Sequence, residues 1–288
     1  MSEGALLLDK PADTTSFGVL SGVKRTFETK RVGHTGTLDR FATGLMVVLV
    51  GRATRLADLA TNQDKRYLFD IVFGTETDTL DPTGQVVGEG RVPERREVEE
   101  VLQEFTGELE QVPPAYSAVH VNGKRASDLA RAGEAPPLQA RRIRIDELVL
   151  VSMEEGVAHV RTSCSKGTYV RSLARDIAGE LGTVGHVGKL RRTRVGAFEV
   201  SEAVEAASIR RESLMSPREF LERLDGVGTA HLDAAAVEKV RHGTPLREEH
   251  VSGGMPEERV FAVLDPTSRV VAVVERTASR FKYRVVFS

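Results

Sequence analysis

A glycine-rich segment near the N-terminus places a carboxylate and an imidazole where a ligand can approach. Residues 33–44 read Gly-His-Thr-Gly-Thr-Leu-Asp-Arg-Phe-Ala-Thr-Gly, with His34 between two glycines and Asp39 three residues after the second. Glycine permits backbone turns that other residues avoid and lets a ligand come close. An ionised aspartate in such a loop can serve as a nucleophile. The spacing alone leaves a second interpretation open, in which Asp39 caps the segment at 41–42 and His34 packs in the turn.

Other signatures of cofactor or metal chemistry fail on inspection. Residues 182–190 read Gly-Thr-Val-Gly-His-Val-Gly-Lys-Leu, one residue too long between the outer glycines for a phosphate-binding loop. This segment also has Leu190 where Ser or Thr would bind magnesium. The chain has one cysteine, Cys164, and seven scattered histidines, which form no metal-ligand pattern. The residues alone therefore indicate neither a phosphate-binding loop nor a metal-ligand cluster.

The composition indicates a globular protein of one large domain, or one large and one small. Of its 288 residues, 40% are apolar, enough to bury a core without disulfide bonds. The longest apolar run, residues 45–50, is the length of a strand rather than a membrane span, and the N-terminus lacks a signal-like region. These features predict a soluble cytoplasmic protein without a membrane segment.

The net charge of −2 hides a strong asymmetry along the chain. Residues 124–194 carry fourteen Lys and Arg against eight Asp and Glu, whereas residues 88–111 carry three against eight. A protein that binds a polyanion on one face needs only that face to be basic. The charge balance therefore permits nucleic-acid binding but does not require it.

The elements that would position these residues can be read from periodicity. Strands are expected at residues 6–8, 45–50, 67–73, 143–151, 157–163 and 281–287, with a hairpin formed by 260–264 and 270–275. Helices are expected after Thr15 or Ser16 as N-cap, with Phe17, Leu20, Val23 and Phe27 on one face, and at 52–60, 98–105, 168–182 and 232–241. Residues 117–144 are polar and basic and resemble an excursion from the core. The class is α+β with a mixed, largely antiparallel sheet.

Several motifs, in order along about 200 residues, resemble those of the TruB family of tRNA pseudouridine synthases. The loop at 33–44 resembles the family's catalytic loop, and Leu-Leu-Leu-Asp-Lys-Pro at 6–11 its opening motif. Further resemblances are Asp-Lys-Arg-Tyr at 64–67, Gly-Thr-Glu-Thr-Asp-Thr at 74–79, Pro-Pro-Ala-Tyr-Ser-Ala at 113–118 with Gly-Lys-Arg at 123–125, Cys-Ser-Lys-Gly-Thr-Tyr-Val-Arg at 164–171, and Leu-Arg-Arg at 190–192. One departure is Arg40-Phe41, where the family usually has Pro-Leu; this adds a positive charge beside Asp39.

The resemblance implies an isomerase that converts uridine 55 in the T loop of tRNA to pseudouridine without a cofactor. It makes Asp39 the nucleophile and Arg171 the cation that keeps Asp39 ionised through a bidentate bond. Tyr67 would stack on the base, and Leu190 would form an apolar wall. Lys10 would support the site rather than perform chemistry.

The resemblance also implies how RNA is held. The target uridine must be flipped out of the folded T loop, and His34 would fill the space it leaves. Basic residues of the excursion would contact phosphates: Lys124, Arg125, Arg131, Arg141, Arg142 and Arg144. The implied domains are a catalytic domain over 1–230, with an RNA-gripping insertion at about 117–144, and a small β-rich PUA-like RNA-binding domain over 231–288. The tRNA T stem-loop is the expected partner, and we expect a monomer with no obligate protein partner.

Two other functions are compatible with the residues alone. One is a non-catalytic RNA-binding or RNA-folding protein that uses the same surface. The other is a glycosidase-like hydrolase that pairs Asp39 with Asp78 or Asp81, which would release free uracil. Such a hydrolase does not require the arginine motif around Arg171.

Overall fold

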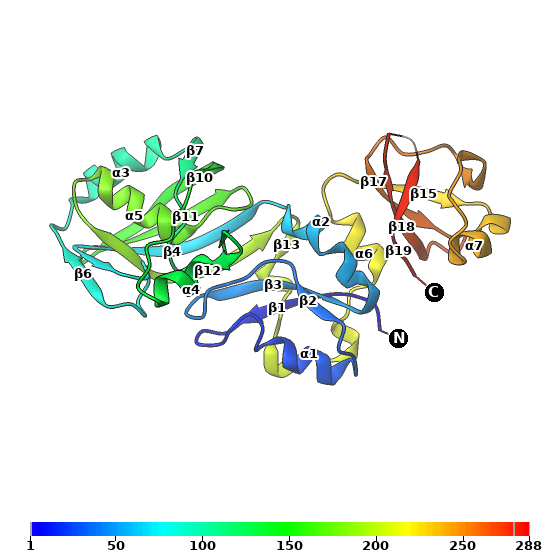
Figure 1. The fold of residues 1–288 in the computed structure, drawn as a ribbon, viewed down its shortest axis with the longest axis horizontal. Helices are drawn as coiled ribbons and strands as arrows, with labels where there is room; N and C mark the ends of the chain where they lie inside the picture. The colour runs from blue at the N-terminus through cyan, green and yellow to red at the C-terminus, as the bar shows by residue number, and fades with distance from the viewer. Residues whose placement is uncertain (1, 279, 288) are drawn as a thin grey trace. The chain divides into compact units, whose positions relative to one another are not determined.

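The computed structural model describes residues 2–278 and 280–287, which fold into two compact units. The first unit contains the residues up to 40, residues 44–63 and those from 195 onward; the second contains 41–43 and 64–194. The chain therefore enters and leaves each unit more than once (Figure 1). The division predicted between residues 230 and 231 is a division by function and stays a prediction.

The first unit contains a group of paired strands, of which β1 (Gly4–Lys10) and β3 (Thr43–Val50) are almost wholly buried. Strand β1 runs antiparallel to β3 and parallel to β14 (Val204–Glu205), while β2 (Val32–His34) pairs with β3. Both predicted strands are thus confirmed. The helical elements of this part include α1 (Leu20–Thr26), η1 (Gly51–Leu56), α2 (Ala57–Thr61) and α6 (Pro217–Glu222).

The first helix begins later than the sequence predicts. Helix α1 starts at Leu20, and Val19 at its N-cap position makes no side-chain cap. The Thr15 hydroxyl accepts from the Gly18 amide at 2.9 Å, so it caps the turn that leads into α1 rather than the helix itself. The Ser16 hydroxyl instead accepts a hydrogen bond from the Leu38 amide and donates one to the Leu38 carbonyl, both at 2.8 Å. Phe17, expected on the buried face, is 70% exposed. The Ser16 alternative was wrong because a tertiary contact uses the hydroxyl that local capping would have used.

The end of the chain forms a five-stranded sheet that belongs to the first unit. Its strand order is β16 (Val251–Ser252), β15 (Val227–Leu232), β17 (Val260–Leu264), β18 (Val270–Arg276) and β19 (Phe281–Val286), with α7 (Ala234–Arg241) after β15. The predicted hairpin is confirmed, because β17 and β18 pair antiparallel. Strand β15, which pairs parallel with β17, was not predicted. The C-terminal sheet is therefore mixed.

The second unit contains several long strands together with helices. Its strand order is β12 (Gly185–Val195), β4 (Lys65–Phe73), β11 (Val157–Cys164), β10 (Arg141–Glu154) and β7 (Gly107–Gln111). The β4–β11, β11–β10 and β10–β7 pairs are antiparallel. The two longer helices of this unit are α3 (Arg95–Glu104) and α5 (Val170–Glu180), and it also contains the hairpin of β5 (Thr75–Thr77) and β6 (Val86–Glu89). The predicted strands at 67–73, 143–151 and 157–163 are confirmed.

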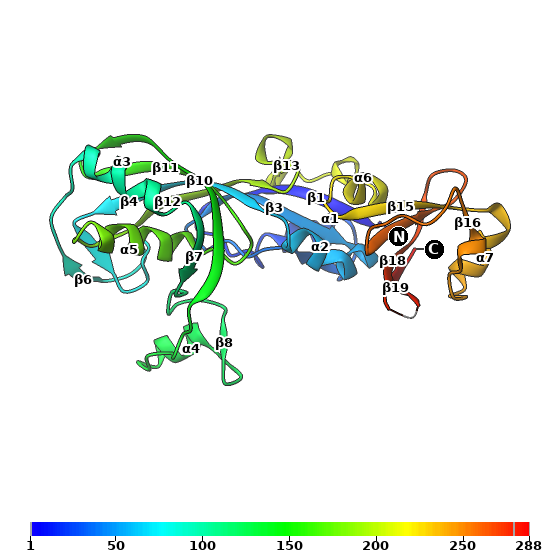
Figure 2. The same cartoon turned by 90° about the horizontal axis from the view of Figure 1, so that it is seen from above.

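The basic excursion is a small subdomain that extends away from β7 and β10 (Figure 2). It contains the two-residue strands β8 (His120–Val121) and β9 (Lys124–Arg125), followed by α4 (Ala126–Arg131). Strand β10 already begins at Arg141, so the last residues of the predicted insertion are strand residues at its foot.

Candidate active site

The loop that carries Asp39 connects β2 to β3 and is held at several backbone points. The Thr35 amide donates to the Val47 carbonyl at 3.0 Å, and the Thr61 hydroxyl donates to the Thr35 carbonyl at 2.6 Å. Leu38 is buried and fixed on both its amide and its carbonyl by Ser16. Asp39, the next residue, is only partly buried. The loop thus presents a carboxylate from a fixed backbone.

Lys10 holds the backbone on the C-terminal side of Asp39, at Arg40. Its side chain is fully buried at the end of β1, and Nζ donates to the carbonyls of Pro11 (2.8 Å), Thr14 (2.7 Å) and Arg40 (3.1 Å). Burial lowers the pKa of Lys10 to about 8, although the negative charges of Asp39 and Asp13 oppose this shift. All three ammonium donors are used to position backbone. The supporting role expected for Lys10 agrees with this geometry.

The structure also places the unexpected charge of Arg40. Its side chain is exposed, and Nε donates to the Asp13 carbonyl at 3.1 Å. Because Lys10 contacts the main-chain carbonyl of Arg40, the loop's anchoring does not depend on the proline usual in the family.

The glycine that adopts a turn conformation in this loop is not the one that the sequence suggests. Gly33 lies within strand β2, and its φ is outside the left-handed region, so it is not a turn glycine. The positive φ in this segment occurs at Gly44 (105°), which faces Lys10 in the β1–β3 register. His34 ends β2 opposite Val48 and is partly buried.

The second unit holds the side chains expected to contact the base. Tyr67 lies on β4 opposite Thr162 and is 8% exposed, and Leu190 on β12 is also buried. Lys65, two residues before Tyr67 and on the same face of β4, is buried as well. Burial lowers the pKa of Lys65 to about 8, and the charge of Arg192 adds to this effect. Sequence inspection did not identify Lys65.

Arg171 is one of the most constrained side chains in the second unit. It is the second residue of α5 and is 5% exposed. Its Nη1 donates to the Thr79 carbonyl at 2.8 Å, and its Nη2 donates to the Tyr116 carbonyl at 2.9 Å. Nη1 also lies 3.6 Å from Asp81 Oδ2. The predicted bond between Arg171 and Asp39 stays a prediction.

Asp81 is one of the two residues that the hydrolase interpretation would pair with Asp39, but its contacts indicate a structural role. It is buried, and its Oδ1 accepts from the Thr79 hydroxyl (2.8 Å), the Thr83 amide (2.9 Å) and the Thr83 hydroxyl (2.5 Å). Its Oδ2 faces Arg171. A carboxylate that is saturated in this way is a structural counter-charge for Arg171. The Asp-Pro-Thr-Gly turn was the sequence signal, since aspartate in such turns accepts local hydrogen bonds.

The predicted phosphate-binding residues fall into two groups. Lys124, Arg125, Arg141 and Arg142 are exposed, as is Arg131, which lies 3.3 Å from Asp128. Arg144, by contrast, is held by Asp64 at 2.8 Å and by Asp146 at 2.7 Å. The two carboxylates already neutralise its guanidinium. A phosphate would have to compete with them for Arg144, whereas within the described ranges the first group has no such pair of aspartates.

Metal-ligand clusters and membrane spans are both absent from the described part of the chain. Residues 2–278 and 280–287 include no group of three His, Cys, Asp or Glu side chains that could hold a metal ion. Within the same ranges no helix is long and apolar enough to cross a membrane. Cys164 is buried on β11, and burial raises the pKa of its thiol to about 12.

Comparison with known proteins defines the class and then the family. The fold matches a chain of the solved Cbf5–Nop10–Gar1 complex with a TM-score of 0.73 at 24% identity, over 99% of this chain and 85% of that one. Residues 24–170 match the TruB family pseudouridylate synthase N-terminal domain, and residues 171–227 match the tRNA pseudouridylate synthase B C-terminal domain. The protein is thus a pseudouridine synthase, an isomerase with the α+β fold of that class.

Full-length relatives specify the family. The tRNA pseudouridine synthase B of Borreliella burgdorferi (strain ZS7) is 34% identical over 291 residues and all of both chains. That of Caulobacter vibrioides (strain ATCC 19089) is 43% identical over 81% of this chain and 76% of its own length. The chain belongs to the TruB family, and the resemblance found in the sequence is confirmed.

Proposed function

We propose that this protein isomerises uridine 55 in the T loop of tRNA to pseudouridine, with Asp39 as the nucleophile. Membership of the TruB family supports the reaction and the substrate class. The observation that carries the assignment of Asp39 is its loop, in which Ser16 fixes residue 38 and Lys10 fixes residue 40. A partly exposed carboxylate between two anchored neighbours is preorganised for attack.

The reaction breaks the N1–C1′ bond of uridine, turns the detached uracil and joins its C5 to C1′. Asp39 stabilises or captures the sugar, which divides one difficult step into two. Arg171 keeps Asp39 ionised, and an arginine does so without losing its own proton. Tyr67 stacks on the uracil as it turns, and Leu190 gives the base an apolar wall. The C5 proton is lost to water at the end, so no metal, nucleotide or redox cofactor is required.

RNA recognition follows from the same assignment. The uridine is flipped from the T loop, at a cost of a few kcal/mol, and His34 occupies the space it leaves. Lys124, Arg125, Arg141 and Arg142 are exposed and bind phosphates. The residues from 231 onward act as a PUA-like RNA-binding domain. We propose that the protein works as a monomer with tRNA as its only obligate partner.

The test is tritium release from a T stem-loop transcript labelled at C5 of its uridines. The wild type should release tritium, whereas Asp39→Asn should bind the RNA with unchanged affinity and release none. Asp13→Asn is the matched control, because Asp13 also lies near Lys10 but is exposed. Normal turnover by Asp39→Asn would refute the assignment of the nucleophile.

The hydrolase alternative is less well supported. It needs a second carboxylate free for acid–base chemistry, but Asp81 is saturated by Thr79, Thr83 and Arg171. Asp78 is exposed and accepts from the Gln85 amide at 2.9 Å. Pseudouridine rather than free uracil is the expected product.

A further inference from the structure

One very short helix of the first unit contacts both the loop that carries Asp39 and the C-terminal sheet. Helix α2 has five residues, and a helix of that length is not stable by itself. Contacts with other elements must therefore set its position. Its Ala60 is fully buried in an apolar cluster that also contains Leu49 of β3 and Val285 of β19. Helix α2 thus takes its place from the C-terminal sheet as well as from β3.

The contact with the loop is made by the last residue of α2. The Thr61 hydroxyl donates to the Thr35 carbonyl at 2.6 Å, and it also lies 2.8 Å from the Ala57 carbonyl of its own helix. Thr35 follows β2 directly, is buried, and donates its amide to the Val47 carbonyl. Both main-chain groups of Thr35 are therefore held, four residues before Asp39. Because a buried carbonyl that loses a donor is costly, the position of Thr61 constrains the start of the loop.

The contact with the C-terminal sheet is an ion pair near the start of α2. Asp58 Oδ2 lies 2.6 Å from Arg284 Nη1 on β19. The Nε of the same guanidinium donates to Glu275 of β18 at 3.1 Å, and these two side chains are only 21% and 17% exposed. A guanidinium held at two nitrogens presents a directional contact. The carboxylate of Glu275 thus orients Arg284 toward α2.

Arg284 reaches α2 from an irregular position in its strand. The pairs Val273–Val285 and Val274–Tyr283 leave Arg284 as the additional residue of a β-bulge. Bulges redirect a side chain from its regular orientation. An ordinary surface ion pair adds little to stability and needs no such distortion. The bulge therefore indicates a directed contact between β19 and α2.

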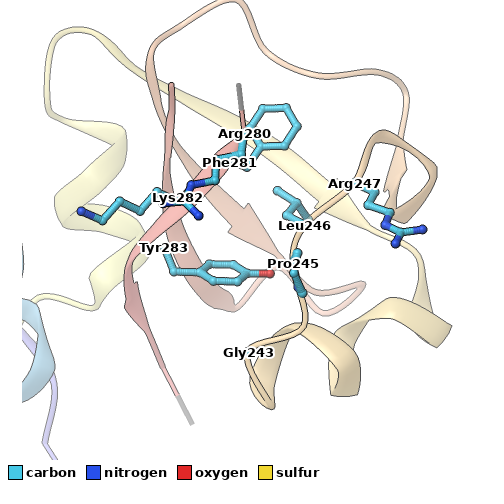
Figure 3. A pocket seen from close by; sticks show the side chains of 8 residues that line it. All are labelled: Gly243, Pro245, Leu246, Arg247, Arg280, Phe281, Lys282 and Tyr283. Atoms are coloured by element: carbon cyan, nitrogen blue, oxygen red, sulfur yellow. The ribbon is translucent and has the colours of Figure 1, made fainter. Parts of the chain in front are cut away.

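Strand β19 is itself anchored at two further points. The Tyr283 hydroxyl donates to the Thr244 carbonyl at 2.6 Å, and Figure 3 shows the Tyr283 ring beside the segment 243–247 that follows α7. Near the end of the strand, the Val286 carbonyl accepts from Arg52 of η1 at 3.0 Å. Since η1 leads directly into α2, the C-terminal sheet supports α2 within one compact unit.

We propose that Thr61, Asp58 and Arg284 are positioning residues for the isomerisation, through which the C-terminal sheet sets the path of the loop that carries Asp39. They act through the main chain of Thr35. The sheet then contributes to the rate of the chemical step as well as to RNA binding. The inference rests on the proposed function, because it takes Asp39 as the nucleophile.

The first test removes the Thr61 hydroxyl and measures single-turnover tritium release from the isolated T stem-loop. Thr61→Val should lower the rate about tenfold, because a misplacement of about 1 Å can cost about a hundredfold. The dissociation constant of the stem-loop should change by less than about twofold. Thr61→Ser keeps the hydroxyl and should keep the wild-type rate. A rate loss matched by an equal loss of affinity would overturn the proposal, and so would a wild-type rate in Thr61→Val.

The second test is a double-mutant cycle on the ion pair. Arg284→Ala and Asp58→Ala should each lower the single-turnover rate about fivefold, and the double variant should be no slower than either. Arg218→Ala is the matched control, because it breaks an ion pair of the same 2.6 Å length on α6, in the same unit. This control should keep the wild-type rate. Additive losses in the cycle, or an equal loss in Arg218→Ala, would contradict the proposal.

Two further measurements separate positioning from folding. Urea midpoints give the folded fraction of each variant, and a rate loss fully accounted for by unfolding would refute the positioning role. Amide exchange at residues 36–40 should become faster in Thr61→Val and Arg284→Ala, and unchanged exchange in both would refute it as well. If wild type releases no tritium, the proposed function fails. If wild type is active and the variants match it, only the present inference fails.

Discussion

Arg171 illustrates what residue types and spacing can and cannot predict about this site. The motif at 164–171 identified Arg171, but its contacts with the carbonyls of Thr79 and Tyr116 have no sequence signal. Main-chain acceptors leave no requirement on side-chain type, so only the structure reveals them. The same holds for Arg144, whose partner Asp64 is 80 residues away in the chain.

Replacing Asp81 by asparagine should lower kcat about 10- to 100-fold, on the scale of one charge-assisted contact. Asparagine can still accept from the Thr83 amide, but it removes the negative charge that faces Arg171. Affinity for the T stem-loop should change by less than about twofold, since Asp81 and Arg171 are both buried. Asp78→Asn is the control on the same loop, and an equal loss in both variants would contradict this role.

The pKa of Lys65 predicts how stability depends on pH. Because this pKa is lowered to about 8 from 10.5, the folded protein releases the proton at a lower pH than the unfolded chain does. Stability should therefore rise with pH between about 8 and 10.5 through this group. Urea midpoints of Lys65→Met should rise less across this window than those of wild type. The exposed Lys30→Met is the control, and parallel curves for Lys65→Met and wild type would reject the prediction.

At the scale of elements, periodicity predicted eight of the strands but missed the others, among them β12 and β15. Strand β12 places Arg192 at a buried position, so its alternation of apolar and polar residues is interrupted. Strand β15 places Gly228 and Ala230 on its buried positions, and small residues give a weak hydrophobic signal. Both strands are fixed by pairing with distant parts of the chain, which a local pattern does not record.

Ser16 connects the turn before α1 to the loop that carries Asp39, through its hydrogen bonds to Leu38. Replacing Ser16 by alanine should therefore destabilise that loop. The change leaves the amide and carbonyl of Leu38 without the hydroxyl that satisfies both, at a cost of about 1–3 kcal/mol in unfolding free energy. Urea denaturation measures the loss, and amide exchange at Leu38 should become faster. Ser21→Ala removes an exposed hydroxyl bond to Gly18 and should cost much less. An equal loss of unfolding free energy in the two variants would contradict the stabilising role of the Ser16–Leu38 contact.

At the scale of the whole molecule, local charge matters more than the net charge of −2. Arg141 and Arg142 lie exposed at the foot of the basic excursion, whereas Arg144 beside them is neutralised by two aspartates. Composition indicated the basic segment correctly but could not separate available arginines from paired ones. That distinction depends on contacts between distant strands.

The Arg141→Ala/Arg142→Ala variant should lower the slope of log affinity against log salt by about 1.4, from two lost phosphate contacts at about 0.7 each. Filter binding of the T stem-loop at salt concentrations between roughly 50 and 300 mM measures this change in slope. Arg144→Ala should shift the slope by less than half as much. A larger effect from Arg144 would mean that RNA displaces its ion pairs.

The burial of Cys164 has a practical consequence for studying this enzyme. The chain has one cysteine, and its thiol is buried with a pKa raised to about 12, so maleimides and iodoacetamides should leave it unmodified. A cysteine introduced at exposed Arg269 or Lys30 would then be the single labelled position. Fluorescent dyes or spin labels could be attached at that position without first removing a native thiol, which allows site-specific labelling of the unaltered fold.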